Sequence, residues 1–163
     1  MRRIYDHGGY SLIELLVYIA LIGTMLIVGT ASVLSVYRTF GVLRVERSIS
    51  LNGDAAMGTM LRDVRAATST SVSSSVLGTH PGELRMNAIK FSLVGSQLVR
   101  QDSSNPQQDV TGNDVRITNL VFYRAESAVS ELVTINMTIE AGSGSFAKSV
   151  PFAGSVVLRG SYK

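Results

Sequence analysis

The sequence of 163 residues contains no cysteine. This excludes a disulfide framework, thiol chemistry and a lipid anchor on an N-terminal cysteine. Histidine is almost as scarce, because only His7 and His80 occur and neither has a partner at metal-ligand spacing. A zinc site is therefore not expected. The chain also lacks a phosphate-binding loop ending in Lys-Ser/Thr and a Gly-x-Ser-x-Gly elbow. With no nucleophile beside a base, we expect no enzymatic activity and no cofactor.

Charge of either sign is missing from one long stretch near the N-terminus. After Glu14 the next charged residue is Arg38. The gap holds roughly 23 residues rich in Leu, Ile, Val and Ala, and about 20 apolar residues in a helix cross a bilayer core. A helix can do this because all its backbone hydrogen bonds are internal. We therefore predict a membrane-spanning helix over residues 12–37.

Glu14 lies one turn inside this apolar helix. A carboxylate at the centre of a membrane helix costs about 2.5–3.5 kcal/mol, and less near an interface. An acid near the start of a helix also suits the helix dipole. Two interpretations follow from the residues alone: either the side chain reaches water at the headgroup boundary, or it has a partner within the membrane.

The residues around Glu14 form a longer motif. A short basic leader, residues 1–9, ends in glycine; Tyr10 follows, and Ser-Leu-Ile-Glu-Leu-Leu then opens the apolar run. This arrangement resembles the class III signal of type IV prepilins and type II secretion pseudopilins. The resemblance implies that a prepilin peptidase cuts between Gly9 and Tyr10 and that Tyr10 is N-methylated. It also implies that Glu14, the fifth residue after the cut, pairs with the N-terminal amine of a neighbouring subunit.

The resemblance implies a bacterial structural subunit of a type IV pilus or a type II secretion pseudopilus. The missing cysteines and a strand order similar to that of J-type pseudopilins favour a minor subunit. Its location would be the inner (cytoplasmic) membrane, single-pass with the N-terminus cytoplasmic before cleavage, and then an extracytoplasmic filament. Its partners would be the prepilin peptidase, other pilin or pseudopilin subunits and an inner-membrane assembly platform. Two alternatives stay open: a DNA-binding or adhesive tip pilin, and a single-pass anchored protein that does not polymerise.

The helix is predicted to continue beyond the apolar span as an amphipathic segment. Apolar residues recur at helical spacing and form a stripe that is expected to cover a sheet: Val42, Val45, Ile49, Ala56, Met60 and Val64. Gly41 and Gly53 could kink or break this helix, since glycine costs about 1 kcal/mol against alanine. We therefore divide the chain into the leader 1–9, a transmembrane helix 10–37, an amphipathic helix 38–70 and a β-sheet domain 71–163.

Beyond Glu83 the apolar residues alternate, which is typical of strands. The pattern predicts strands over residues 83–86, 88–94, 97–101, 115–124, 132–140, 146–150 and 155–159. Val121 and Tyr123 are expected on the same face as Ile117, and Pro151 and Gly154 are expected to mark a bulge, an edge or a break between the last two strands. The predicted fold class is α+β and pilin-like, with one long N-terminal helix packed on an antiparallel β-sheet.

Two sets of polar residues could form binding sites. The predicted loop after residue 101 carries oxygen ligands that suit calcium, namely Asp102, Asn105, Asp109, Asn113 and Asp114. The spacing is not that of an EF-hand, so we favour a solvated loop without metal. A basic face on the sheet could hold phosphates, with Arg85, Lys90, Arg100, Arg116, Arg124, Lys148, Arg159 and Lys163. Acids interleave these residues and the net charge is only +3, which favours a mixed solvated surface.

Overall fold

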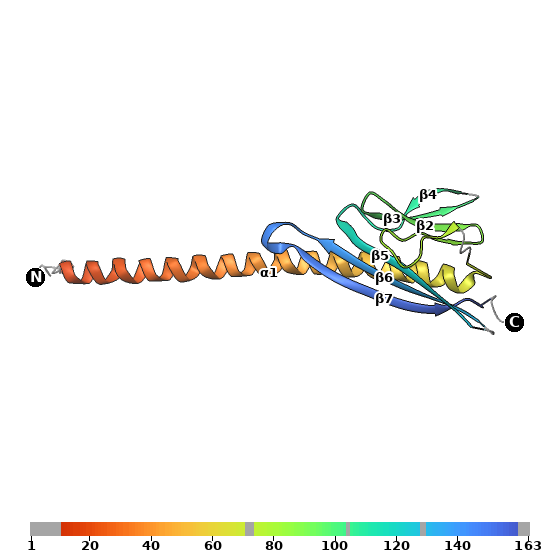
Figure 1. Cartoon of the computed structure of the whole chain (residues 1–163). Helices are drawn as coiled ribbons and strands as arrows, with labels where there is room; N and C mark the ends of the chain where they lie inside the picture. The colour runs from red at the N-terminus through yellow and green to blue at the C-terminus, as the bar shows by residue number, and fades with distance from the viewer. Residues whose placement is uncertain (1–10, 71–73, 104, 128–129, 160–163) are drawn as a thin grey trace, which may run out of the picture. The chain divides into compact units, whose positions relative to one another are not determined.

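The computed structural model describes residues 11–70, 74–103, 105–127 and 130–159. The chain divides between Gly41 and Val42 into two compact units. Helix α1 (Leu12–Ala66) supplies the described part of the first unit and continues into the second. The second unit also holds the described strands and a short 3₁₀ helix, η2 (Gly144–Phe146) (Figure 1).

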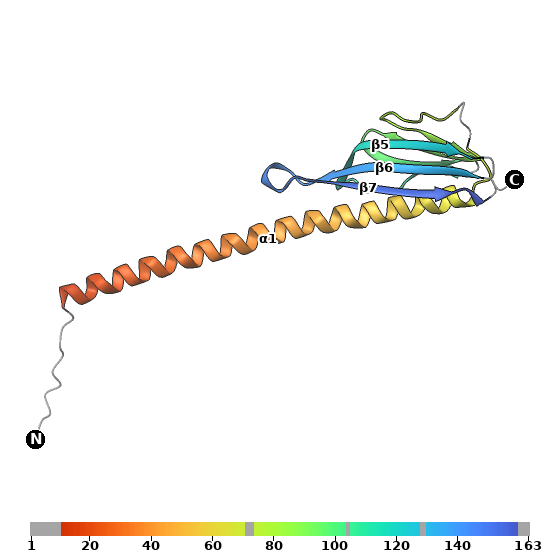
Figure 2. The same ribbon diagram turned by 60° about the horizontal axis from the view of Figure 1, so that its bottom comes forward.

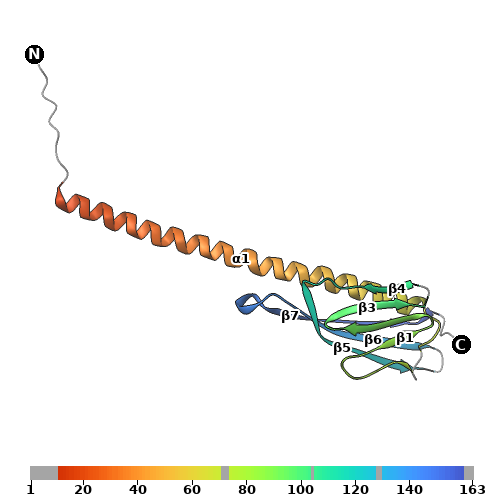
Figure 3. The ribbon, with the colours of Figure 1, turned by 90° about the horizontal axis from the view of Figure 1, so that it is seen from above.

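Among the described residues of the second unit, seven strands form two antiparallel meanders. Their bounds are β1 (Leu84–Met86), β2 (Ile89–Val94), β3 (Gln97–Asp102), β4 (Asn105–Asp109), β5 (Val115–Glu126), β6 (Glu131–Ala141) and β7 (Lys148–Val157). The first sheet has the order β1-β2-β3-β4 and the second the order β5-β6-β7, as Figure 3 shows for the neighbours β3 and β4. The predicted α+β fold class, a long N-terminal helix on antiparallel strands, is confirmed, but the strands form two sheets where one was expected.

The core lies between the second half of α1 and the two sheets. The predicted apolar stripe is buried from Ile49 to Val64, whereas Val42 is 40% exposed. Alternate residues of β6 from Glu131 to Ala141 are buried. The largest buried side chains come from all three layers: Ile49, Met60, Leu84, Met86, Phe91, Leu98, Leu120, Phe122, Ile135, Met137, Ile139 and Leu158.

Helix α1 continues through both Gly41 and Gly53 without a break. Gly53 is buried, and a Cβ atom built there would lie 2.2 Å from Cζ of Phe152 on β7. In Figure 2, β7 lies beside the yellow part of α1. The absence of a side chain at residue 53 therefore lets the aromatic ring pack against the helix backbone.

Strand β4 corrects the prediction that residues 102–113 form only a loop. Backbone pairing holds β4 on β3, with Asp109 opposite Val99 and Gln108 opposite Arg100. Its residues from 106 to 109 are exposed. An exposed edge strand needs no apolar alternation, so the sequence of β4 carries no strand pattern.

The predicted alternation along β5 is wrong beyond Ile117. The register with β6 shifts between Ile117 and Asn119, and such a bulge exchanges the two faces of the strand that follows. Leu120 and Phe122 are fully buried, while Tyr123 is 46% exposed.

Strand β7 runs through Pro151 and Gly154 as the outer strand of its sheet, so these two residues mark an edge and not a break between two strands. The amide of Leu158 donates to the carbonyl of Glu131 at 3.0 Å, which marks these two residues as a hydrogen-bonded pair. Because such pairs alternate along an antiparallel ladder, the nitrogen of Pro151 points away from β6. Proline there removes no ladder hydrogen bond.

Candidate functional site

The first half of α1 presents an apolar surface. Helix α1 is long and apolar enough to cross a membrane, by length and composition. Its large apolar side chains are exposed from the first turn onward; Leu12 is 83% exposed and Ile27 is 71% exposed. An exposed apolar surface of this extent marks a site of membrane or protein interaction.

Three hydroxyl groups of this span donate hydrogen bonds within the helix itself. Thr24 donates to the carbonyl of Leu21 at 2.9 Å, and Thr30 donates to that of Leu26 at 2.8 Å. Ser32 donates to the carbonyl of Val28 at 2.9 Å. An unsatisfied donor in lipid costs several kcal/mol, so these internal hydrogen bonds make the span compatible with a bilayer core.

Glu14 is exposed and, among the described residues, has no cationic partner. The hydroxyl of Tyr18 points at Oε1 of Glu14 from 3.4 Å, which is long for a hydrogen bond. The carbonyl of Ser11 accepts from the amides of Glu14 at 3.0 Å and Leu15 at 3.2 Å. Ser11 and Glu14 therefore have the spacing of a capping box. The predicted processing residues Gly9 and Tyr10 lie outside the described residues.

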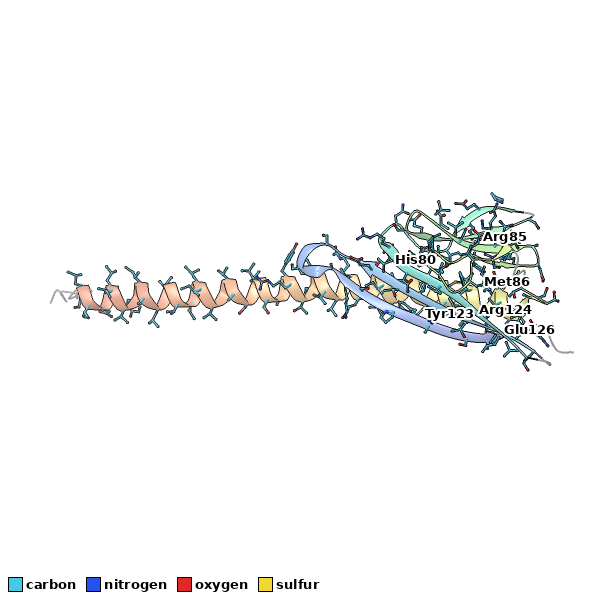
Figure 4. The ribbon with its side chains drawn as sticks, viewed as in Figure 1. His80, Arg85, Met86, Tyr123, Arg124 and Glu126 are labelled. Carbon is cyan, nitrogen blue, oxygen red and sulfur yellow. The ribbon has the colours of Figure 1, made fainter. Side chains whose placement is uncertain are left out.

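Another acidic residue, Glu131, lies in the interior of the sheet unit. Glu131 is 5% exposed, and its Oε1 accepts from Nε of Arg124 at 2.7 Å and from the hydroxyl of Thr70. Burial by itself raises the pKa of Glu131, but the hydrogen bonds from Arg124 and Thr70 outweigh it and hold that pKa below its ordinary value of 4.5. Arg124 also pairs with Glu126 at 2.9 Å, beside it on β5 in Figure 4.

The Glu131 network joins the segment after α1 to β5 and β6. The sequence prediction did not single out Glu131. The sequence does indicate the burial of Glu131, because it lies an even number of residues before the buried Val133 and Ile135 and so faces the same side of β6. Extending the predicted strand 132–140 by one residue at its start would have placed this carboxylate on the core face.

Two of the candidate calcium ligands, Asp102 and Asp114, have partners within the protein. Asp102 lies 3.7 Å from Arg100. Asp114 accepts hydrogen bonds from Ser48 and, at 3.5 Å, from Asn52. The Ser48 contact is the main cause that lowers the pKa of Asp114. In the part of the chain that the structure describes, no group of three or more His, Cys, Asp or Glu residues could hold a metal ion.

The predicted basic face consists largely of ion pairs. Six of its members have acidic partners: Arg85 and Lys90 with Glu83, Arg100 with Asp63, Arg116 with Glu140, Arg124 with Glu131, and Lys148 with Glu46. Lys163 lies outside the described residues. His80 is also engaged, since its Nδ1 accepts from the amide of Leu120 at 3.0 Å.

Comparisons of the chain with models of protein families, with curated proteins and with solved structures found no match.

Proposed function

We propose that this chain is a prepilin-like structural subunit. In this proposal it is cut after Gly9, N-methylated at Tyr10 and assembled through the first half of α1 into a type IV pilus or a type II secretion pseudopilus, as a minor subunit. The observation that carries the proposal is the exposed apolar span of α1 with Glu14 in its first turn. The leader sequence before Tyr10 supports it.

The proposed mechanism is packing of one subunit against the next. A carboxylate near the apolar span is stabilised by a cation that shares its low-dielectric surroundings. The described residues of the chain supply no such cation to Glu14. The new N-terminal amine of a neighbouring subunit would supply it, and the apolar faces of the two helices would then cover each other.

Location and partners follow from the same proposal. The uncut chain is inserted in the inner membrane with its N-terminus cytoplasmic, and the peptidase, other subunits and the assembly platform act on it there. After cleavage the chain joins an extracytoplasmic filament. The ion pairs of the sheet unit occupy most of its basic residues, so they give the DNA-binding alternative no support.

The assembly role of Glu14 is tested by separating its charge from its capping position. Gln suits a capping box as well as Glu does, so Glu14→Gln removes the charge and preserves the helix start, whereas Glu14→Ala removes both. We expect both variants to insert in the membrane and to enter filaments about tenfold less than the wild type, which corresponds to about 1.4 kcal/mol. Sheared filaments and membranes from a host with a pilus machine are compared by immunoblot.

Tyr18→Phe serves as the matched control, because it removes only the hydroxyl near Glu14. We expect this variant to enter filaments at the wild-type level. Normal incorporation of Glu14→Gln would contradict the assembly role, and a defect confined to Glu14→Ala would assign Glu14 to helix capping.

A further inference from the structure

Strand β7 leaves one edge of the second sheet open. In the order β5-β6-β7, none of the described strands lies on the outer side of β7. Hydrogen-bonded and non-hydrogen-bonded residue pairs alternate along β6 and β7, and Leu158 with Glu131 is a hydrogen-bonded pair. The backbone amides of four residues of β7 therefore point away from β6: Ser149, Ala153, Ser155 and Val157. Within the described ranges, these amides have no backbone partner.

The opposite edge of the same sheet is covered. The amides of Gly78 and Gly82 donate to the carbonyls of Phe122 and Leu120 on β5, each at 2.8 Å. The amide of Ile117 donates to the carbonyl of Ser96, also at 2.8 Å. The chain therefore protects β5 with its own loops and leaves β7 available, which is an unusual condition for a strand of ten residues.

A groove lies at the C-terminal end of this open edge. Its lining residues are Arg65, Ser155, Val156, Val157 and Arg159, and its volume is about 410 Å³. Three successive strand residues line it although their side chains alternate between the two faces, so the backbone edge itself forms one wall. Arg65 belongs to the last turn of α1, and Arg159 follows the end of β7.

The two arginines of the groove differ from the ion-paired basic residues of the sheet unit. Arg65 and Arg159 are exposed, and neither has an acidic partner in the described part of the chain. By contrast, Arg100 and Arg124 each lie 2.7 Å from a carboxylate. A planar guanidinium group matches a carboxylate through two parallel hydrogen bonds, so the groove has the charge complement of an acidic ligand.

We propose that this groove binds an extended acidic segment of a partner protein, which adds to β7 as a further strand and pairs its carboxylates with Arg65 and Arg159. Backbone hydrogen bonds along the open edge supply affinity, and the guanidinium groups select the acidic side chains. A peptide fits better than a nucleic acid, because none of the described residues that line the groove is an aromatic one for base stacking. The inference does not depend on the prepilin proposal.

The test uses the full chain in detergent micelles and two fluorescent six-residue probes. One probe is Val-Glu-Thr-Val-Glu-Thr, and its twin carries Gln in place of both Glu residues. We expect the Glu probe to bind at least about tenfold tighter than its twin at low salt, since hydrogen bonds to charged groups are the stronger kind. Fluorescence anisotropy measures both affinities.

Variants of the protein separate the charge from the backbone edge. Arg65→Gln combined with Arg159→Gln is expected to bind both probes equally. Ser155→Pro removes an outward amide inside the groove and is expected to weaken the Glu probe about tenfold. Ser149→Pro makes the same change at the far end of β7 and is expected to leave binding unchanged.

Several outcomes would overturn the proposal. These are equal binding of the two probes to the wild type, no binding of the Glu probe at millimolar concentration, and wild-type affinity of the Ser155→Pro variant. Arginine-dependent binding of a short oligothymidine in place of the Glu probe would assign the groove to nucleic acid instead. If circular dichroism shows that Ser155→Pro is unfolded, a Glu probe with N-methylated amides replaces it, and its unweakened binding would refute strand addition.

Discussion

Two glycines of α1 meet opposite surroundings, and substitutions distinguish them. At Gly58 an added Cβ atom would meet no atom within 4 Å, whereas at Gly53 it would lie 2.2 Å from Cζ of Phe152. Alanine favours a helix over glycine by about 1 kcal/mol, so Gly58→Ala is expected to stabilise the sheet unit by about that amount. Overpacking costs about 1–3 kcal/mol, so Gly53→Ala is expected to destabilise it by about 1 kcal/mol.

Thermal unfolding of both glycine variants, followed by far-UV circular dichroism of the full chain in detergent, checks this pair. The account expects midpoints that move in opposite directions. A stabilising effect of Gly53→Ala would contradict the close packing of Phe152 on the helix.

The buried carboxylate Glu131 makes stability depend on pH. Its pKa is lower in the folded chain than its ordinary value of 4.5, so its contribution is complete above that pH and is lost as the pH falls through the folded pKa. Glu131→Gln is expected to destabilise the chain at pH 7, because Arg124 then loses its buried partner. We expect the stability difference from wild type to shrink below pH 4.5, as chemical denaturation at several pH values can measure. A difference that is constant with pH would contradict the buried ion pair.

Residues also differ in how far the sequence predicts their environment. The burial of Glu131 is predictable from Val133, because side chains two residues apart on a strand point to the same face of the sheet. The contact of Asp63 with Arg100, at 2.7 Å, joins residues that are 37 positions apart. No local spacing indicates such a pair, since it depends on how α1 lies on the first sheet.

At the scale of the element, β7 gives a test of strand register. Val150 lies opposite Ile139 in a hydrogen-bonded position, next to the outward-pointing Pro151. Val150→Pro removes a ladder hydrogen bond, whereas Val150→Ala removes only packing. We expect the proline variant to be about 1–3 kcal/mol less stable than the alanine variant, the cost of an unmade buried hydrogen bond. Equal stability in denaturant unfolding would contradict the assigned alternation.

Elements with one buried face are predicted well from the sequence. The expected strand 132–140 matches β6, which runs Glu131–Ala141, because its alternation records burial directly. The bulge after Ile117 and the edge strand β4 were not predicted. The position of a bulge depends on the pairing with the neighbouring strand. Strand β4 is held by backbone hydrogen bonds, so its exposed side chains need not alternate between apolar and polar residues.

At the scale of the whole molecule, the two parts of α1 have different environments. Before Gly41 the apolar side chains are exposed, and after Val45 the stripe is buried under the sheets. The sequence predicted this change of character, because charged residues return at Arg38. The sequence of a single chain does not identify what covers the exposed apolar part of α1. In the proposed function, lipid covers it first and neighbouring subunits cover it later.

The intact mass of the chain after co-expression with an active prepilin peptidase tests whether the chain is a prepilin. We expect the mass of residues 10–163 plus one methyl group. We expect an uncut chain for Gly9→Leu, which places a bulky side chain at the cleavage position. A wild-type chain that keeps residues 1–9, while a control prepilin is cut by the same peptidase, would contradict the account and leave a β-rich domain on a membrane anchor.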